Sequence, residues 1–365
     1  MMQTAVGSRL SRRALVAAVV SGLVLAKPLR AWSQESDAES LVAAMNPRER
    51  AARMFMFPVS GTVLSPEDDA WLRALKPGGV ILVGDNFGTP EEVRALVAAI
   101  HDTNPDLPPL VALDQEGGIV SRIADDPAPD APTMGQLPPA EISALARARA
   151  ETLSGYGFDV NFAPVADVAF IPESFMAGRV FDSDPTAVTE DVAAYLAGVE
   201  GTRVLHAVKH FPGHGRVSVD SHEALPVLNV DSTTWWHEDA QPFKVAIEAG
   251  VPMVMLGHLS VPSWDDLPAS LSAEAVRVLR QELGFTGVVV SDDLGMGALM
   301  SWTPFEIVDL AVAAGNDLLL FVIANEEPEA LVDHLAARVT SEDSSAEQVT
   351  TSVERLLSMQ LGPRQ

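Results

Sequence analysis

From residue 50 to its end, the chain alternates between short apolar runs rich in β-branched residues and longer amphipathic stretches. Strands buried on both faces are continuous hydrophobic runs, whereas a helix that covers a sheet has apolar residues on one side only. The alternation therefore predicts repeated strand–helix units. We expect eight strands, at residues 54–59, 79–83, 110–114, 159–163, 206–210, 251–256, 287–291 and 317–322.

Helix start signals lie between these runs. Residues 89–102 open with a Thr, a Pro and two Glu, which is the capping chemistry of a helix N-terminus. Similar signals begin at Ser65, Ser272 and Thr303. Eight strands with intervening helices predict an α/β protein with a single (β/α)8 TIM-type barrel, with slight irregularity allowed. An open doubly wound sheet is the alternative, but its glycine-rich fingerprint is missing after the first strand.

Composition and charge narrow the function classes. The chain has no cysteine, which excludes disulfides, thiolate metal sites and cysteine nucleophiles. Its 50 acidic residues outnumber 24 basic ones, for a net charge of −26, and so we expect no nucleic-acid partner. No cofactor motif is recognised, and we expect no cofactor and no structural or catalytic metal.

The first 33 residues have the composition of an export signal. Basic residues that include Arg12 and Arg13 precede an apolar run at residues 14–26, and Ala31-Trp32-Ser33 offers small residues for cleavage before Gln34. The paired arginines resemble a twin-arginine signal. The apolar run is too short to span a membrane, so we expect an exported, periplasmic or secreted protein without a stable membrane anchor. A buried N-terminal helix is the alternative.

Polar residues follow several of the predicted strands. The third run ends in Asp114-Gln115-Glu116-Gly117-Gly118, the fifth in Lys209-His210, the sixth continues to His258, and the seventh ends in Ser291-Asp292-Asp293. Chemistry in such barrels collects at the carboxyl ends of the strands, so these side chains predict a site there. Of the two adjacent carboxylates, one is free to act as a nucleophile and the other to be structural. A helix cap or loop tie is the alternative role for either.

The segment at residues 209–222, KHFPGHGRVSVDSH, is the densest group of reactive side chains. Its proline and glycines predict a loop after the fifth strand. Asp220, two residues before His222, can accept the Nδ1 proton of the imidazole and leave Nε2 free for proton transfer. Two alternatives stay open at this point. The pair can be a solvated turn, or His210, His214 and His222 can bind zinc.

These segments resemble the β-N-acetylhexosaminidases of glycoside hydrolase family 3, across nearly all of the chain after the signal. The family motif Lys-His-Phe/Ile-Pro-Gly followed by Asp-Ser/Thr-His is complete in residues 209–222. Three further segments agree in order: residues 114–118 with Arg122, residues 161–168, and residues 178–181 with Asp184-Pro185. The resemblance implies that residues 34–365 are one catalytic barrel domain.

The resemblance also implies the site residues. Asp292 would be the nucleophile, and His222, oriented by Asp220, the acid/base of a two-step retaining mechanism. The residues implied to bind the terminal sugar are Asp114, Arg122, Arg179, Lys209 and His210. The expected activity is release of terminal β-linked N-acetylglucosamine from peptidoglycan fragments or chitooligosaccharides, by a monomer whose partner is its carbohydrate substrate.

The sequence departs from the family pattern in two places. Ile119 stands where the family commonly has Arg, and residues 256–259, Leu-Gly-His-Leu, replace Ser-Ala-His-Val. The alternative functions are a phosphorylase on the same scaffold, because a histidine base does not repel phosphate, and a glycan-binding barrel without catalysis.

Overall fold

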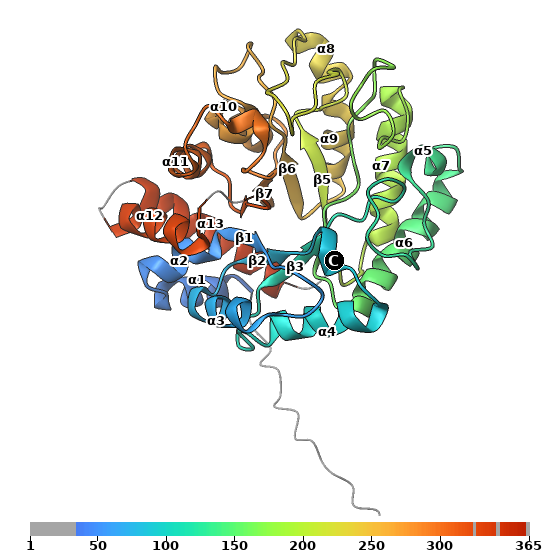
Figure 1. Ribbon diagram of the computed structural model, residues 1–365. Helices are drawn as coiled ribbons and strands as arrows, with labels where there is room; N and C mark the ends of the chain where they lie inside the picture. The colour runs from blue at the N-terminus through green and yellow to red at the C-terminus, as the bar shows by residue number, and fades with distance from the viewer. Residues whose placement is uncertain (1–33, 324–325, 341–343, 363–365) are drawn as a thin grey trace, which may run out of the picture. The chain divides into compact units, whose positions relative to one another are not determined.

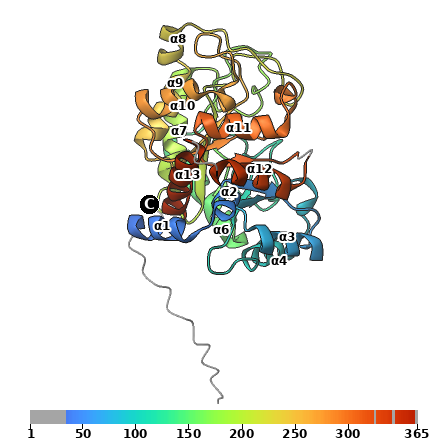
Figure 2. The same cartoon turned by 90° about the vertical axis from the view of Figure 1, so that its left-hand side faces the viewer.

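The eight predicted strands are all present in the computed structural model, which describes residues 34–323, 326–340 and 344–362. Figure 1 shows the strands at the centre of a ring of helices, and Figure 2 shows the same arrangement from the side. The strands are β1 Phe55–Pro58, β2 Gly79–Ile81, β3 Leu110–Leu113, β4 Val160–Asn161, β5 Leu205–Phe211, β6 Met253–Leu256, β7 Val288–Ser291 and β8 Leu319–Leu320.

The strands form one parallel sheet in the order β7-β6-β5-β4-β3-β2-β1-β8. A parallel bridge between Val290 and Leu318, with the Ser291 amide 3.0 Å from the Leu318 carbonyl, brings the two edge strands together. The sheet is therefore a nearly closed barrel, as predicted, and its one register shift lies in β5 between Val208 and Phe211.

The helices follow the strands in the alternating order that the sequence predicts. They are α1 Gln34–Ala44, α2 Pro47–Arg53, α3 Pro66–Leu75, α4 Pro90–His101, α5 Ala131–Met134, α6 Pro139–Tyr156, α7 Pro185–Val199, α8 Ser232–His237, α9 Ala240–Glu248, α10 Ala273–Arg277, α11 Pro304–Ala314, α12 Pro328–Thr340 and α13 Ser344–Leu361. The predicted caps are confirmed: Ser65, Thr89, Ser272 and Thr303 each accept a backbone N–H of the first turn.

Two apolar layers hold the barrel together because successive strand residues point to opposite faces. In β6, Met253 and Met255 pack inside the barrel, while Val254 and Leu256 pack outward against the helical ring. Aromatic side chains add stacking on the outer face of β1, where Phe55 and Phe57 lie 5.3 Å apart. Each strand is thus fixed from both sides, which gives its carboxyl end a fixed position.

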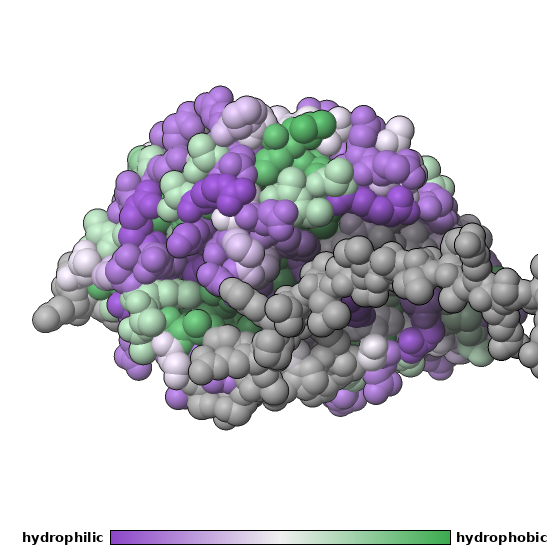
Figure 3. Space-filling model, turned by 90° about the horizontal axis from the view of Figure 1, so that it is seen from below, coloured by the Kyte–Doolittle hydropathy of each residue, from purple (hydrophilic) through white to green (hydrophobic). Residues whose placement is uncertain are grey.

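The described residues from Gln34 onward form one compact unit. The proposed export signal at residues 1–33 lies outside the described residues. None of the described helices is long and apolar enough to cross a membrane. The face seen from below Figure 1 is a mosaic of hydrophilic residues with small hydrophobic patches (Figure 3).

Candidate active site

A pocket of about 290 Å³ opens at the carboxyl ends of the strands, where the sequence predicts the site. Its polar floor is formed by residues that close β3, β5 and β7, and its wall includes loop residues such as Phe175 and Met296. Seven of the eight predicted site residues line it, namely Asp114, Arg122, Arg179, Lys209, His210, His222 and Asp292. The eighth, Asp220, contacts the pocket through His222.

Asp292 lies on the floor of this pocket, directly after β7. Its Oδ1 accepts the Asp293 backbone N–H at 2.8 Å, and its own N–H donates to the Leu256 carbonyl on β6 at 2.9 Å. Burial alone would raise the pKa of this carboxyl, but nearby His210 and His258 outweigh it and lower the pKa below its ordinary value. Asp292 is therefore held as a carboxylate, the form that a nucleophile needs.

Asp293 also lines the pocket, but its carboxylate ties the end of β8. Its Oδ1 accepts backbone N–H groups of Gly295 at 2.9 Å and Val322 at 2.8 Å. Burial raises the pKa of this carboxyl. The two adjacent carboxylates thus differ in environment, and the geometry gives Asp293 a structural position.

Four charged side chains form a second group at this pocket. The Lys209 ammonium donates to Asp114 at 2.6 Å and to Glu116 at 2.7 Å, and the Arg179 guanidinium binds both oxygens of Glu116, at 2.7 and 2.9 Å. Burial would raise the pKa of Glu116, but Lys209 and Arg179 outweigh it and hold the pKa at about 2. The network presents fixed donors and acceptors of the kind that bind sugar hydroxyls.

His210 is fixed in the same floor by Asp167, which follows β4. The Asp167 carboxylate lies 2.7 Å from His210 Nδ1 and accepts the His214 backbone N–H at 2.6 Å. The register shift in β5 accompanies this arrangement, because the adjacent side chains of Lys209 and His210 both reach the pocket instead of pointing to opposite faces.

The Asp220–His222 pair lies at the pocket mouth. Asp220 Oδ1 is 2.7 Å from His222 Nδ1 and also accepts the His222 backbone N–H at 2.8 Å. The His222 side chain remains 56% exposed, and its ring lies 6.0 Å from the Phe175 ring. Nδ1 is therefore committed to the carboxylate, and Nε2 is the nitrogen left for proton transfer.

Some residues of the site were missing from the prediction. Glu116 and Asp167 stand in motifs that the sequence singles out, but their partners come from other strands and no local signal identifies them. The expectation that His258 contributes to the mouth is wrong: it is fully buried and bonds Ser270 Oγ at 2.7 Å and the Asp293 carbonyl at 2.8 Å. It fixes the backbone carbonyl directly after the two adjacent aspartates.

The zinc alternative finds no ligand set in the described part of the chain. Among residues 34–323, 326–340 and 344–362, no three histidine or acidic side chains are placed to share a metal ion. His210 and His214 are each bonded to other groups, with Asp167 on the first and Ser221 Oγ at 3.2 Å from the second.

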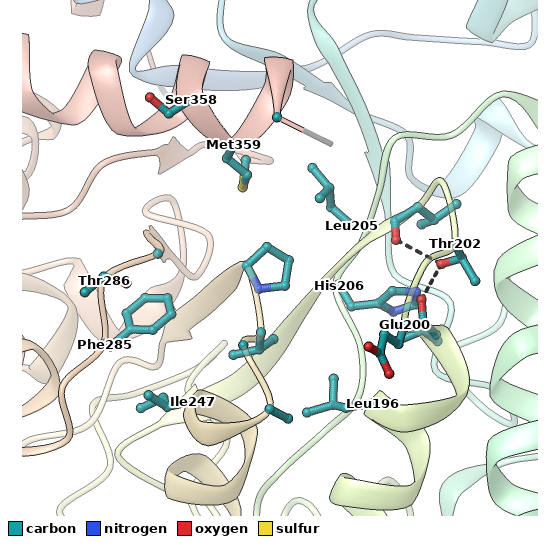
Figure 4. Close-up of a pocket in the computed structure, with 18 of the residues that line it drawn as sticks. Leu196, Glu200, Thr202, Leu205, His206, Ile247, Phe285, Thr286, Ser358 and Met359 are labelled. Carbon is teal, nitrogen blue, oxygen red and sulfur yellow. Dashed lines mark hydrogen bonds between the residues drawn. The ribbon is translucent and has the colours of Figure 1, made fainter. Parts of the chain in front are cut away.

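A second pocket, of about 390 Å³, lies at the opposite end of the barrel, at the amino ends of β5, β6 and β7. Figure 4 shows its lining, in which apolar side chains such as Leu196, Ile247 and Phe285 predominate. Glu200 is the one carboxylate among the described residues that line this pocket. The described lining therefore contains no pair of a histidine and a carboxylate like that of His222 and Asp220. The histidine that is paired with a carboxylate, His222, and the Asp292 carboxylate both line the first pocket.

Comparisons with known proteins agree with this geometry. The family described as "Glycosyl hydrolase family 3 N terminal domain" matches residues 48–359. A beta-hexosaminidase of Alkalilimnicola ehrlichii is 36% identical over 291 residues, which cover 77% of this chain and 83% of that protein, and one of Vibrio cholerae is 35% identical over 295 residues, 77% of this chain and 86% of that protein.

Solved structures agree as well. A family 3 beta-N-acetylglucosaminidase from Paenibacillus sp. superimposes with a TM-score of 0.83 at 31% identity over 87% of this chain, which spans 62% of that structure's length. The structure titled "M tuberculosis LpqI" gives a TM-score of 0.81 at 32% identity, over 90% of this chain and 97% of that one.

Proposed function

Since the chain belongs to glycosyl hydrolase family 3 and is a glycoside hydrolase of the β-hexosaminidase kind, we propose that it releases terminal β-linked N-acetylglucosamine with retention of configuration. The observation that carries this proposal is the placement of the Asp292 carboxylate on the floor of the pocket that has the His222–Asp220 pair at its mouth. We propose peptidoglycan fragments or chitooligosaccharides as substrates.

In the first step, Asp292 attacks the anomeric carbon from the pocket floor. At the same time, His222 donates its Nε2 proton to the leaving glycosidic oxygen. The carbon–oxygen bond to the leaving group breaks as the ester bond to Asp292 forms. The lowered pKa of Asp292 supports this role, because the carboxylate is ionised before substrate binds.

In the second step, neutral His222 removes a proton from water, which attacks the anomeric carbon and releases Asp292. Two inversions at one carbon give net retention. Asp220 acts through His222: its carboxylate fixes the tautomer and favours the imidazolium that forms when the base takes up its proton.

The terminal sugar would be held by the charged network. Lys209, Asp114 and Arg179 are fixed by one another and by Glu116, so they bind hydroxyls without losing much side-chain freedom. Arg122, at the pocket edge, and His210, beside Asp292, complete the set of donors around the ring.

A covalent trapping experiment tests the proposal. The protein would be incubated with a slow fluorinated N-acetylglucosaminyl substrate and its peptides mapped by mass spectrometry. We expect the label on Asp292 and none in Asp292→Ala. A label on Asp293 would overturn the assignment, and NMR of the first-formed product anomer would test retention independently.

Phosphate as acceptor is the second candidate, and the observation that favours it is the histidine base, which carries no negative charge to repel an anion. Turnover in phosphate buffer would then give sugar 1-phosphate, whereas only free sugar would remove this candidate. Binding without turnover would instead indicate a glycan-binding barrel.

We also propose that the protein is exported, because residues 1–33 have the composition of an export signal. We propose that it is a monomer, because residues of one chain line the pocket. Replacing Arg12 and Arg13 with Lys should retain the protein in the cytoplasm if the twin-arginine route is used. Cell fractionation and light scattering measure the two properties.

A further inference from the structure

His214 is a buried histidine at the catalytic pocket, and the proposed mechanism gives it no role. It lines the pocket with 2% of its surface exposed. Its Nε2 lies 3.2 Å from Ser221 Oγ, and its Nδ1 is buried without a hydrogen-bond partner in the described part of the chain. Among the described residues, Ser221 is therefore the one hydrogen-bond partner of this imidazole.

The backbone at His214 is fixed to the pocket floor. Asp167 accepts the His214 amide at 2.6 Å and also lies 2.7 Å from His210 Nδ1, so one carboxylate joins both residues. The next residue, Gly215, packs so closely against Val168 that a Cβ would lie 1.8 Å from the Val168 carbonyl oxygen. His214 is thus a fixed point from which the rest of the loop extends.

Ser221 lies at the other end of this loop, between the two members of the acid/base pair. It is 3% exposed, whereas the side chains of Asp220 and His222 are 30% and 56% exposed. The turn therefore directs Ser221 inward and the pair outward. The Ala298 amide donates to the Ser221 carbonyl at 3.0 Å, so Ser221 is held by its backbone from the β7 connection and by its hydroxyl from His214.

Two neighbouring rings limit the movement of the His214 imidazole. The centroid of the Phe175 ring lies 5.7 Å from that of His214, and the centroid of the His210 ring lies 6.1 Å away. Burial lowers the pKa of His214 below its ordinary value, so the imidazole is neutral at neutral pH and bonds a hydroxyl in either tautomer. The side chain is thus held in the orientation that reaches Ser221.

We propose that His214 is a positioning residue, which through its hydrogen bond to Ser221 fixes His222 where it can transfer a proton to the leaving oxygen. The inference rests on the proposed glycosidase function and adds two residues to its acid/base system. A displacement of about 1 Å lowers the rate of an enzyme reaction about 10²-fold, so a hydrogen bond that prevents such a displacement contributes measurably to the rate.

A comparison of two leaving groups tests this role. In N,N′-diacetylchitobiose the leaving group is a sugar hydroxyl, which needs a proton as it leaves, whereas dinitrophenolate leaves the dinitrophenyl N-acetyl-β-glucosaminide as a stable anion. Ser221→Ala and His214→Asn should lower kcat/KM for the disaccharide about ten- to hundredfold and change it little for the dinitrophenyl substrate. A purely structural role would lower both values by the same factor.

A conservative variant and a matched control complete the test. His214→Gln should regain most of the activity that His214→Asn loses, because the Gln amide reaches as far as Nε2 and the Asn amide does not. Ser352→Ala also removes one buried serine hydroxyl, which bonds Asp317 at 2.8 Å and belongs to α13. It should leave the ratio of the two kcat/KM values unchanged.

The results that would overturn the proposal are distinct. Equal losses for both substrates in Ser221→Ala would show that the hydrogen bond stabilises the structure only. If His214→Gln loses cleavage of the disaccharide and Ser221→Ala retains it, His214 acts on the substrate itself and not through Ser221.

The wild-type protein separates this inference from the function on which it rests. If wild type cleaves neither substrate, the glycosidase proposal fails, and the positioning role with it. If wild type cleaves only the dinitrophenyl substrate, no proton reaches a sugar leaving group, and the positioning role fails alone.

Discussion

Replacing Glu116 with Gln should destabilise the protein by about 3 kcal/mol at pH 7 without changing the volume of the side chain. In the folded protein Lys209 and Arg179 hold the pKa of Glu116 at about 2, against an ordinary value of 4.5. A tenfold change in proton affinity corresponds to about 1.4 kcal/mol, so the difference amounts to about 3 kcal/mol in favour of the ionised form. Glutamine resembles the neutral form and leaves one buried cation without its partner.

The sign of the pH dependence follows from the lowered pKa. The stabilisation by Glu116 is fully present above pH 4.5 and is lost as the pH falls through about 2. Urea unfolding followed by tryptophan fluorescence should therefore show the largest difference between wild type and Glu116→Gln at neutral pH, and a smaller one below pH 4.5. The same variant should raise KM, because Arg179 and Lys209 lose the group that orients them.

The matched control is Glu91→Gln. The Glu91 side chain is 84% exposed and lies 3.7 Å from Arg94, so its removal should change the free energy of unfolding by less than about 0.5 kcal/mol. If Glu116→Gln unfolds within 1 kcal/mol of wild type at pH 7, the charged network does not stabilise the fold and the reasoning fails.

Three other substitutions test separate parts of the molecule. Asp220→Asn should lower kcat/KM about 10²- to 10⁴-fold in steady-state assays with little change in Tm, because the imidazole of His222 loses the carboxylate that orients it. Arg149→Met should lower the free energy of unfolding by about 3 to 5 kcal/mol, since its buried guanidinium pairs with Asp126 at 2.7 Å and binds three backbone carbonyls. Burial lowers the pKa of His206 to about 4, so between pH 7 and pH 5 the unfolded chain takes up a proton that the folded protein does not. Over this range the free energy of unfolding of wild type should therefore fall by about 2 kcal/mol more than that of His206→Gln.

Each of these has an outcome that would contradict it. Asp220→Asn within tenfold of wild-type activity would show that His222 needs no orienting group. The control for Arg149→Met is Arg147→Met, on the exposed side of the same helix. An equal loss in the free energy of unfolding in both variants would show that the buried contacts of Arg149 do not stabilise the fold. Parallel pH profiles for wild type and His206→Gln would show that folding does not lower the pKa of His206.

The barrel was predictable because its strands are short continuous apolar runs, and all eight form. Their lengths were less predictable, as the last strand shows. Residues 317–322 were expected to be strand, but the ladder covers only Leu319–Leu320. Asp317 is instead a buried anchor that accepts from Arg280 at 2.6 Å, Ser352 at 2.8 Å and Arg355 at 2.5 Å. Those partners come from other elements, and local sequence does not reveal them.

The same distinction applies to the site. Asp292 follows an apolar strand, and Asp220 lies two residues from His222, so local spacing was sufficient to single them out. Glu116 is joined to the site only through Lys209 from β5 and Arg179 from the connection after β4. Such a network depends on the order and register of the strands. Local sequence patterns do not give strand order or register, so these contacts could not be predicted before the fold was known.

The proposed nucleophile and acid/base are positioned by different means. Asp292 is placed by the strand ladder itself, through backbone hydrogen bonds to β6. His222 lies on a long loop, which is fixed at its base because Asp167 accepts the His214 amide, and near its middle because Arg216 binds both oxygens of Asp239 at 2.9 and 2.8 Å.

The tip of that loop is held by the β7 connection, whose Gly297 and Ala298 amides donate to the His222 and Ser221 carbonyls at 3.2 and 3.0 Å. Asp292 and the contact for His222 therefore belong to one connected segment, residues 288–298. A change that shifts this segment therefore moves Asp292 and His222 together and keeps the distance between them. The proposed two-step mechanism requires that distance to stay constant, because both groups act on the same anomeric centre. Substitutions at Gly297, where a Cβ would lie 2.4 Å from the His222 carbonyl oxygen, should accordingly disturb the acid/base more than the nucleophile.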